Sequence, residues 1–205
     1  MIAMIDYGVG NLLSLKSSFS AIGAETVVTG DPEVIRSADK LILPGVGAFG
    51  DAAELLRRDG LDKLVTEEAK GGKPLLGICL GMQLLFDYGL EYGRHEGLGL
   101  IPGSVRPVAD YIPAGYKSPH IGWNALHFPA GKPGSPLFRH IHENECVYFV
   151  QSFCGAECED SVIATAEYGA ELTAAVAKDN VYGVQFHPEK SGEVGLNILR
   201  AFCEL

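Results

Sequence analysis

The sequence has few basic residues and no long hydrophobic run. Lysine and arginine together number 16 against 26 aspartates and glutamates, which gives a formal net charge of −10. Nucleic acids and anionic membrane surfaces bind basic patches, so we expect neither as the main partner. The apolar runs stay well under the roughly 20 residues that a membrane helix requires. No basic segment precedes the apolar stretch Met1–Ile5, so we expect no secretory signal and a cytoplasmic location.

The sequence also lacks the cysteine and glycine patterns of common cofactor sites. Its five cysteines are odd in number and irregularly spaced, so we expect reduced thiols and not a disulfide framework. A zinc site could be imagined in one region, but its C-x3-C and H-x-H spacings match no common finger, and no metal is expected. The residues of that region are Cys146, Cys154, Cys158, His140 and His142. Gly8-Val9-Gly10 has Leu13 where a dinucleotide-binding turn needs its third glycine, so no nicotinamide or flavin is expected.

Short apolar runs alternate with helical spacing through about residue 90, which indicates a parallel α/β sheet. Strands are expected at 2–5, 25–28, 40–43 and 73–78, and helices at 11–22, 51–58, 61–69 and 82–88. The second half is mostly β, with runs at 105–108, 121–128, 146–153, 162–167, 173–178 and 181–186, loops at 110–119 and 130–134, and a final helix at 192–202. No composition shift suggests a boundary, so residues 1–205 are expected to form a single domain.

Cys79 lies in Gly77-Ile78-Cys79-Leu80-Gly81, which closes a predicted strand and opens a helix. This is the spacing of a nucleophile elbow, with cysteine in place of serine. A thiol at a helix N-terminus has its thiolate stabilised by the peptide dipoles, and the Leu80 N–H would face an oxyanion. The alternative is a buried core cysteine, because free cysteine is often buried.

A base for such a thiol follows the last apolar strand, in His187-Pro188-Glu189. In an extended segment, residues i and i+2 project to the same side, so Glu189 could hold one imidazole nitrogen while the other faces the thiol. The alternative is a solvated strand end.

Pro44-Gly45-Val46-Gly47 ends the third strand beside the elbow strand, and its glycines could turn Val46 and Gly47 N–H groups toward a ligand. An ordinary glycine-rich turn is the other interpretation.

With these segments in hand, the chain resembles class I (triad-type) glutamine amidotransferase domains. Within that family it is similar to the glutaminase subunits of imidazole glycerol phosphate synthases, and the similarity extends over the whole chain. Besides the elbow, the loop and His187-Pro188-Glu189, the segments that carry the similarity are Asp6–Leu12, Leu43–Phe49, Pro119–Asn124 and Glu189–Ser191. The resemblance implies a three-layer, open, mostly parallel sheet with flanking helices and an antiparallel β extension.

The resemblance also implies a reaction and a set of roles. Cys79 would attack the amide of glutamine, and His187, oriented by Glu189, would protonate the departing ammonia and then activate water. Ammonia would pass to a separate (β/α)8 cyclase subunit that makes imidazole glycerol phosphate and an aminoimidazole carboxamide ribotide in histidine biosynthesis. Oxyanion donors would be Leu80, Val46 and Gly47; substrate contacts Gly47, Gln83, Glu91 and Ser152; and heterodimer contacts Asn11, Trp123 and Lys190. No cofactor is implied.

Some points stay open at this stage. Trp123 could be a core residue, and Lys190 a plain surface charge. Family members often have His-Ser-Tyr where this chain has Gln151-Ser152-Phe153, which changes the hydrogen bonding near Ser152. The chain could also serve another synthase, in the anthranilate, guanylate or pyridoxal phosphate pathway, or be a non-catalytic regulatory module on the same fold.

Overall fold

The computed structural model describes residues 1–131 and 133–205, and a seven-stranded sheet forms its centre. The strands are β1 (Ile2–Ile5), β2 (Thr26–Thr29), β3 (Lys40–Leu43), β4 (Leu75–Ile78), β11 (Val162–Glu167), β12 (Glu171–Lys178) and β13 (Val181–Val184). Their order is β11-β12-β13-β4-β3-β1-β2. The five strands from β13 to β2 run parallel, and β12 and β11 extend the sheet in antiparallel fashion. The predicted α/β class, with its antiparallel extension, is confirmed.

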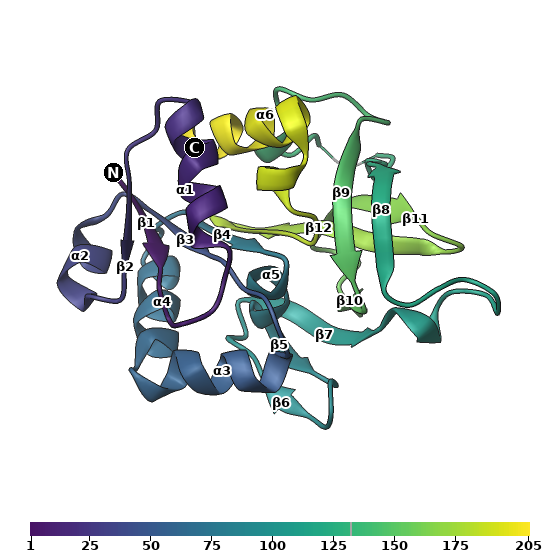
Figure 1. Ribbon diagram of the computed structural model, residues 1–205, viewed down its shortest axis with the longest axis horizontal. Coiled ribbons are helices and arrows are strands. Elements are labelled where there is room, and N and C mark those ends of the chain that lie inside the picture. Colours follow the sequence, from purple (N-terminus) through teal and green to yellow (C-terminus); the bar gives the residue numbers. More distant parts are fainter. Residues whose placement is uncertain (132) are drawn as a thin grey trace.

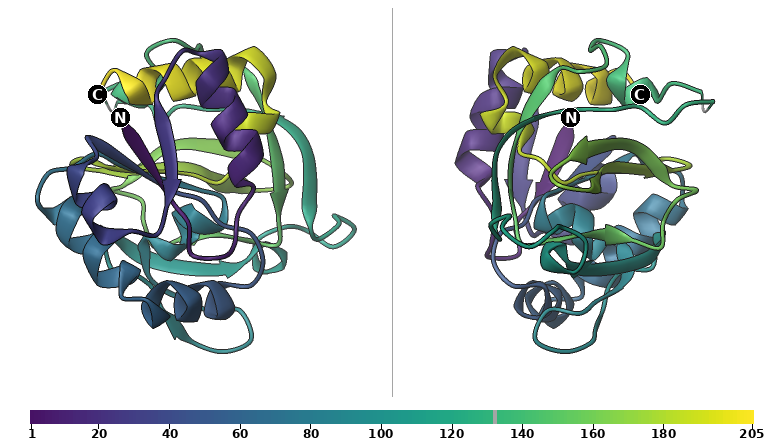
Figure 2. Two further views of the ribbon diagram at one scale, coloured as in Figure 1. Left: turned by 60° about the vertical axis from the view of Figure 1, so that its left-hand side comes forward. Right: turned by 90° about the vertical axis from the view of Figure 1, so that its right-hand side faces the viewer.

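Helices cover both faces of this sheet and make three layers (Figure 1). On one face lie α1 (Leu12–Ala21) and α6 (Gly192–Cys203), which Figure 2 shows side by side, and on the other lie α2 (Pro32–Ser37), α3 (Phe49–Arg58) and α4 (Leu61–Lys70). Alternating side chains of the buried strands pack on opposite sides. Leu41 and Leu43 of β3 pack in the cluster that includes α3 and α4, whereas Ile42 packs with α1 and α6.

Two smaller sheets are built from strands between residues 86 and 156. A four-stranded sheet has the order β10-β7-β5-β6, and β8 pairs with β9 alone. The bounds are β5 (Phe86–Gly89), β6 (His95–Glu96), β7 (Ile101–Pro107), β8 (His120–Ala125), β9 (Cys146–Gln151) and β10 (Phe153–Ala156). The residues that the structure describes also form three short 3-10 turns: η1 (Val108–Asp110), η2 (Pro136–Phe138) and η3 (Pro188–Lys190). Of the loop expected at 130–134, Lys132 lies outside the described residues.

Two elements expected from the sequence are wrong. The helix expected at 82–88 ends early: α5 (Leu80–Leu84) is one short helix, and residues 86–89 form β5. The apolar run Leu84-Leu85-Phe86 fits either structure locally, and pairing with β7 and β6 decides for a strand. The strand expected at 146–153 divides at Ser152, because β9 pairs with β8 and β10 pairs with β7.

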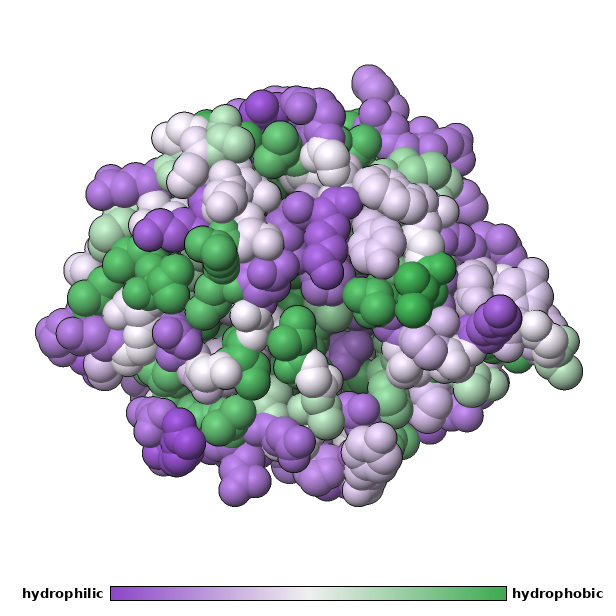
Figure 3. All heavy atoms as spheres, in the orientation of Figure 1, coloured by the Kyte–Doolittle hydropathy of each residue, from purple (hydrophilic) through white to green (hydrophobic). Residues whose placement is uncertain are grey.

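The surface mixes hydrophobic and hydrophilic side chains, as Figure 3 shows for the face in the orientation of Figure 1. Its exposed large hydrophobic residues are Met1, Leu13, Val46, Tyr92, Tyr111, Tyr116, Ile121 and Trp123. Within the described part of the chain, no helix is long and apolar enough to cross a membrane.

The carboxyl ends of the parallel strands meet at one edge of the central sheet. Tyr7 lies just beyond β1, Pro44 follows β3, Cys79 follows β4 and Gln185 follows β13. In open α/β sheets this edge is where ligands bind. The order of the strands therefore gathers distant segments of the sequence into one place.

Helix α6 packs against the turn that follows β13 through a glycine. A Cβ atom at Gly195 would overlap the carbonyl oxygen of Pro188. We expect Gly195→Ala to push the η3 turn away and to lower the free energy of unfolding by about 2 kcal/mol or more. Urea unfolding followed by circular dichroism measures this change. The control is Gly134→Ala, where a Cβ meets nothing within 4 Å, and equal stability of the two variants would contradict the packing argument.

Candidate active site

Cys79 occupies a strained turn between β4 and α5. Its φ of 56° and ψ of −114° lie outside the regions that L-residues favour. The turn is held by the Cys79 N–H, which donates to the Val184 carbonyl at 2.8 Å. Glycine is needed beside it for space: a Cβ at Gly81 would overlap the Leu43 carbonyl, and one at Gly77 would lie 2.6 Å from the Gly81 oxygen. The alternative of a core cysteine does not hold, because Cys79 is only partly buried and lines a pocket.

His187 and Glu189 form a buried pair next to this thiol. The imidazole Nδ1 lies 2.8 Å from Glu189 Oε1, and the two side chains are 4% and 1% exposed. The extended segment expected here is a 3-10 turn from Pro188 to Lys190, and it still brings the two side chains together. The alternative of a solvated strand end is therefore wrong. Glu189 Oε2 is buried with no hydrogen-bond partner among the described residues.

Ser191 holds the turn in place; it belongs to a segment that carries the family similarity, but no role was expected for it. Its hydroxyl donates to the His187 carbonyl at 2.7 Å and accepts from the Tyr148 N–H at 3.0 Å. Because Tyr148 belongs to β9, this one hydroxyl ties the His187 backbone to a different sheet. A serine two residues after a glutamate is too common a pattern to predict such a contact.

The environment of His187 favours its charged form. Burial lowers the pKa of the imidazole, but hydrogen bonds to Cys79 and Glu189, with the negative charges of those groups, outweigh burial and raise it from 6.5 to about 9. The imidazole of His187 therefore stays protonated at neutral pH. Such a histidine can act as an acid before it acts as a base.

The Pro44–Gly47 loop lies beside the thiol and is held by a hydrogen bond from Tyr7. The buried Tyr7 hydroxyl donates to the Pro44 carbonyl at 2.7 Å, and burial raises the pKa of that phenol. Gly47 has φ +99°, a conformation that favours glycine, and Val46 is 42% exposed. No role was expected for Tyr7 either.

A pocket of about 320 Å³ opens over these groups. It is lined by Val46, Gly47, Cys79, Leu80, Gln83, Glu91, Pro119, Val150, Gln151, Ser152, Phe153 and His187. The structure thus brings together the residues expected as nucleophile, base, oxyanion donors and substrate contacts, with Glu189 behind the base. Their individual roles stay predictions.

Two of these lining residues also have structural partners. Gln83 donates through Nε2 to the Phe153 carbonyl at 3.3 Å and to Gln185 Oε1 at 3.0 Å. Glu91 accepts from the Phe49 N–H at 2.7 Å, at the start of α3. Glu91 therefore holds the chain just beyond Gly47, so it fixes the loop as well as facing the pocket.

The segment Gln151-Ser152-Phe153, which departs from the common family wording, forms one wall of the pocket. Gln151 is buried and its Nε2 lies 3.4 Å from His120 Nδ1, while Ser152 is exposed. His120 stacks between the rings of Phe149 and Tyr168. The side chain of Gln151 is thus integrated into the packing of β8 and β9.

Asn11, Trp123 and Lys190 lie outside the pocket lining. Trp123 is 55% exposed, so it is not a core residue. The centres of the Trp123 and Tyr148 rings lie 5.9 Å apart in an edge-on contact, and the Lys190 ammonium lies 6.0 Å from the centre of the Tyr148 ring. Asn11 precedes α1, whose Leu13 is 78% exposed. The expected role of these residues in binding a partner stays a prediction.

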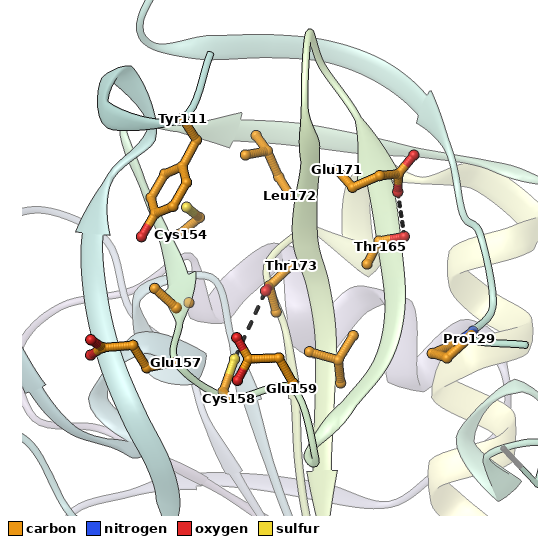
Figure 4. Close-up of a pocket in the computed structure, with 13 residues that line it drawn as sticks. Tyr111, Pro129, Cys154, Glu157, Cys158, Glu159, Thr165, Glu171, Leu172 and Thr173 are labelled. Carbon is orange, nitrogen blue, oxygen red and sulfur yellow. Dashed lines mark hydrogen bonds between the residues drawn. The ribbon is translucent and has the colours of Figure 1, made fainter.

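A larger hollow of about 570 Å³ lies elsewhere and shares no lining residue with this pocket (Figure 4). Tyr111, Cys154 and Cys158 line it, and Cys158 Sγ lies 3.9 Å from Thr173 Oγ1. Among the described residues, no group of three or more His, Cys, Asp or Glu side chains could hold a metal ion.

The raised pKa of His187 predicts a pH-dependent stability. A folded-state pKa near 9 above an unfolded value near 6.5 contributes stability that is fully present below pH 6.5 and is lost as pH rises through 9. We expect the free energy of unfolding to fall across this window in the wild type, and to fall less in His187→Gln and Cys79→Ser. Urea titrations at several pH values measure it, and parallel curves for all three proteins would contradict the coupling.

Comparison with known proteins agrees with this geometry. The family model described as glutamine amidotransferase class-I matches residues 3–204. The chain is 46% identical to imidazole glycerol phosphate synthase subunit HisH of Oceanobacillus iheyensis, covering 100% of this chain and 99% of that protein. It is 49% identical to the subunit of the same name from Sulfurimonas denitrificans, covering 100% and 98%.

Solved structures show the same fold at lower identity. One described as a glutamine amidotransferase has a TM-score of 0.76 at 19% identity and covers 100% of this chain and 98% of its own. PurLQS from Thermotoga maritima has a TM-score of 0.77 at 19% identity, with 99% and 97% covered. The family match over nearly the whole chain and the full-length relatives lead to one conclusion: this protein belongs to the class-I glutamine amidotransferases.

Proposed function

We propose that this chain is the glutaminase subunit of an imidazole glycerol phosphate synthase. It hydrolyses glutamine to glutamate and ammonia, and the ammonia goes to a separate cyclase subunit. Relatives named as this subunit, 46% and 49% identical over the full length of the chain, support the assignment. The observation that carries the chemistry is the buried His187–Glu189 pair, hydrogen-bonded to Cys79 at a pocket of about 320 Å³.

The first half of the reaction uses the proton that His187 holds. The Cys79 sulfur attacks the carbon of the substrate's side-chain amide as a thiolate, and the amide oxygen becomes an oxyanion. The carbon–nitrogen bond then breaks as His187 gives its proton to the nitrogen, and ammonia leaves. A thioester between Cys79 and the glutamyl group remains, with His187 neutral and held by Glu189.

The second half returns the enzyme to its starting state. Neutral His187 takes a proton from water, whose oxygen attacks the thioester carbon. The carbon–sulfur bond breaks, the product leaves as a carboxylic acid that gives its proton to solvent to become glutamate, and Cys79 and His187 are again thiolate and imidazolium. Glu189 stabilises the imidazolium in both halves, which its short contact with Nδ1 supports.

The surrounding pocket serves the same chemistry in this proposal. The N–H groups of Leu80, Val46 and Gly47 stabilise the oxyanion, and Gly47, Gln83, Glu91 and Ser152 hold the substrate. Gln83 uses Nε2 for two bonds within the protein, so its oxygen is the atom left to meet the substrate. An oxygen accepts only, which suits the ammonium or amide N–H groups of glutamine.

We also propose that residues 1–205 act as one domain in the cytoplasm, without a cofactor, in a heterodimer with a (β/α)8 cyclase. Asn11, Trp123 and Lys190 contact that partner, which turns the ammonia into imidazole glycerol phosphate and an aminoimidazole carboxamide ribotide. The exposure of Trp123 supports this use, because a half-exposed tryptophan is typical of a binding surface.

Replacement of the nucleophile tests the chemistry. We expect Cys79→Ala to lower glutamate release by several orders of magnitude, measured with the cyclase and its ligand present, because a catalytic unit fails when one member is removed. Cys146→Ala is the control, since that cysteine is exposed and does not line the pocket. Equal rates for Cys79→Ala and the wild type would rule out Cys79 as nucleophile and favour a regulatory module.

Reconstitution with candidate partners tests the pathway. Purified chain is mixed with the cyclase or with the anthranilate, guanylate or pyridoxal phosphate synthase, and glutamine-dependent product is measured. We expect product only in the mixture with the cyclase, because the full-length relatives are named as a subunit of imidazole glycerol phosphate synthase. Product with another synthase and none with the cyclase would overturn the assignment.

A further inference from the structure

Gln185 is a buried polar residue beside the sulfur that the reaction above does not use. It is fully buried, and its side-chain Nε2 lies 3.8 Å from Cys79 Sγ. Parallel pairing explains the contact: Ile78 lies opposite Val184, so the next residues on each strand, Cys79 and Gln185, leave the sheet side by side.

Hydrogen bonding dictates which end of this amide faces the sulfur. The Phe153 carbonyl can only accept, so the bond from Gln83 at 3.3 Å places the Gln83 NH2 group there. The same NH2 group lies 3.0 Å from the Gln185 side chain, which must present its oxygen as the acceptor. The remaining end of Gln185, its NH2 group, then faces Cys79. One backbone carbonyl thus orients two amides in series.

We propose that Gln185 is a positioning residue for the nucleophile, whose amide N–H donates to the Cys79 sulfur in the orientation that Gln83 and the Phe153 carbonyl impose. The inference rests on the proposed function, in which that sulfur is the attacking atom. A hydrogen bond to an ionised acceptor is stronger than one to a neutral group, so the amide favours the thiolate over the thiol. It also favours the thiolate that forms again when water breaks the thioester carbon–sulfur bond.

The thiolate fraction of Cys79 measures this directly. The rate of alkylation by iodoacetamide is followed from about pH 5 to pH 10, and mass spectrometry of the Cys79 peptide separates it from the other cysteines. We expect Gln185→Met to raise the midpoint of the pH–rate profile by about one unit, which is about tenfold less thiolate at a given pH.

Asn180 offers a matched control. Its side-chain amide also makes two hydrogen bonds, at 2.8 Å to the Ala69 carbonyl and at 2.7 Å to the Lys73 carbonyl, at the opposite end of β4 and β13. Asn180→Leu should lower the melting temperature and leave the alkylation midpoint at the wild-type value. If Gln185 had a purely structural role, its variants would also have a lower melting temperature and an unchanged alkylation midpoint.

The outcomes separate the inference from the proposed function. An unchanged midpoint in folded Gln185→Met overturns the inference. If that variant does not fold, Gln185→Asn replaces it, because its shorter amide withdraws from the sulfur, and an unchanged midpoint there has the same meaning. Glutamate release by Cys79→Ala tests the proposed function separately. If that variant is active, Cys79 is not the nucleophile and the proposed function fails. If it is inactive and the Gln185→Met midpoint is unchanged, only the role of Gln185 is rejected.

Discussion

The parallel pairing of β4 with β13 is the constraint on which the site depends. It joins segments that are 106 residues apart in the sequence, Cys79 and Gln185, and it brings His187 within reach of the same sulfur. The Cys79 N–H is itself part of this pairing, since it donates to the Val184 carbonyl. Backbone hydrogen bonds of the central sheet therefore place the thiol, and the bond from the His187 N–H to the Tyr148 carbonyl of β9 at 2.9 Å places the backbone of the imidazole.

Two lines of polar groups reach the sulfur from different directions. One runs from Glu189 through His187, and the other from the Phe153 carbonyl through Gln83 and Gln185. Burial alone would leave His187 neutral, and its partners reverse that preference. The second line contains amides alone, so it carries no charge and its desolvation costs less. The site therefore combines one ionic partner with one neutral partner around a single atom.

Much of this could be predicted from the sequence, because the signals are local. The elbow around Cys79, the His187-Pro188-Glu189 segment and the alternation of strands and helices each depend on neighbouring residues. Failures arose where distant contacts decide. Residues 86–89 form a strand because β7, later in the chain, pairs with them, and the break at Ser152 reflects two different partner strands.

No role was predicted from the sequence for Tyr7, Gln185 or Ser191, and the reason is the same for all three. Each makes its contact with an atom far away in the chain or with a backbone carbonyl, and neither leaves a pattern of spacing. Sequence reasoning could place Cys79 at the end of a strand. It could not show that a fully buried glutamine would lie against the sulfur, because that depends on the register between β4 and β13.

The backbone of Cys79 has a consequence of its own. A non-glycine residue at φ 56° and ψ −114° is held in a conformation that costs of order 1–3 kcal/mol, and the cost is met when the sheet forms, long before any substrate arrives. A local opening of β4 from β13 would release that energy and withdraw the thiol from His187 in the same event. The reactive geometry therefore depends on this pairing as a whole: without it, the strain at Cys79 and the contact between thiol and imidazole are lost together, and because β4 and β13 lie in the middle of the sheet, such an opening is costly.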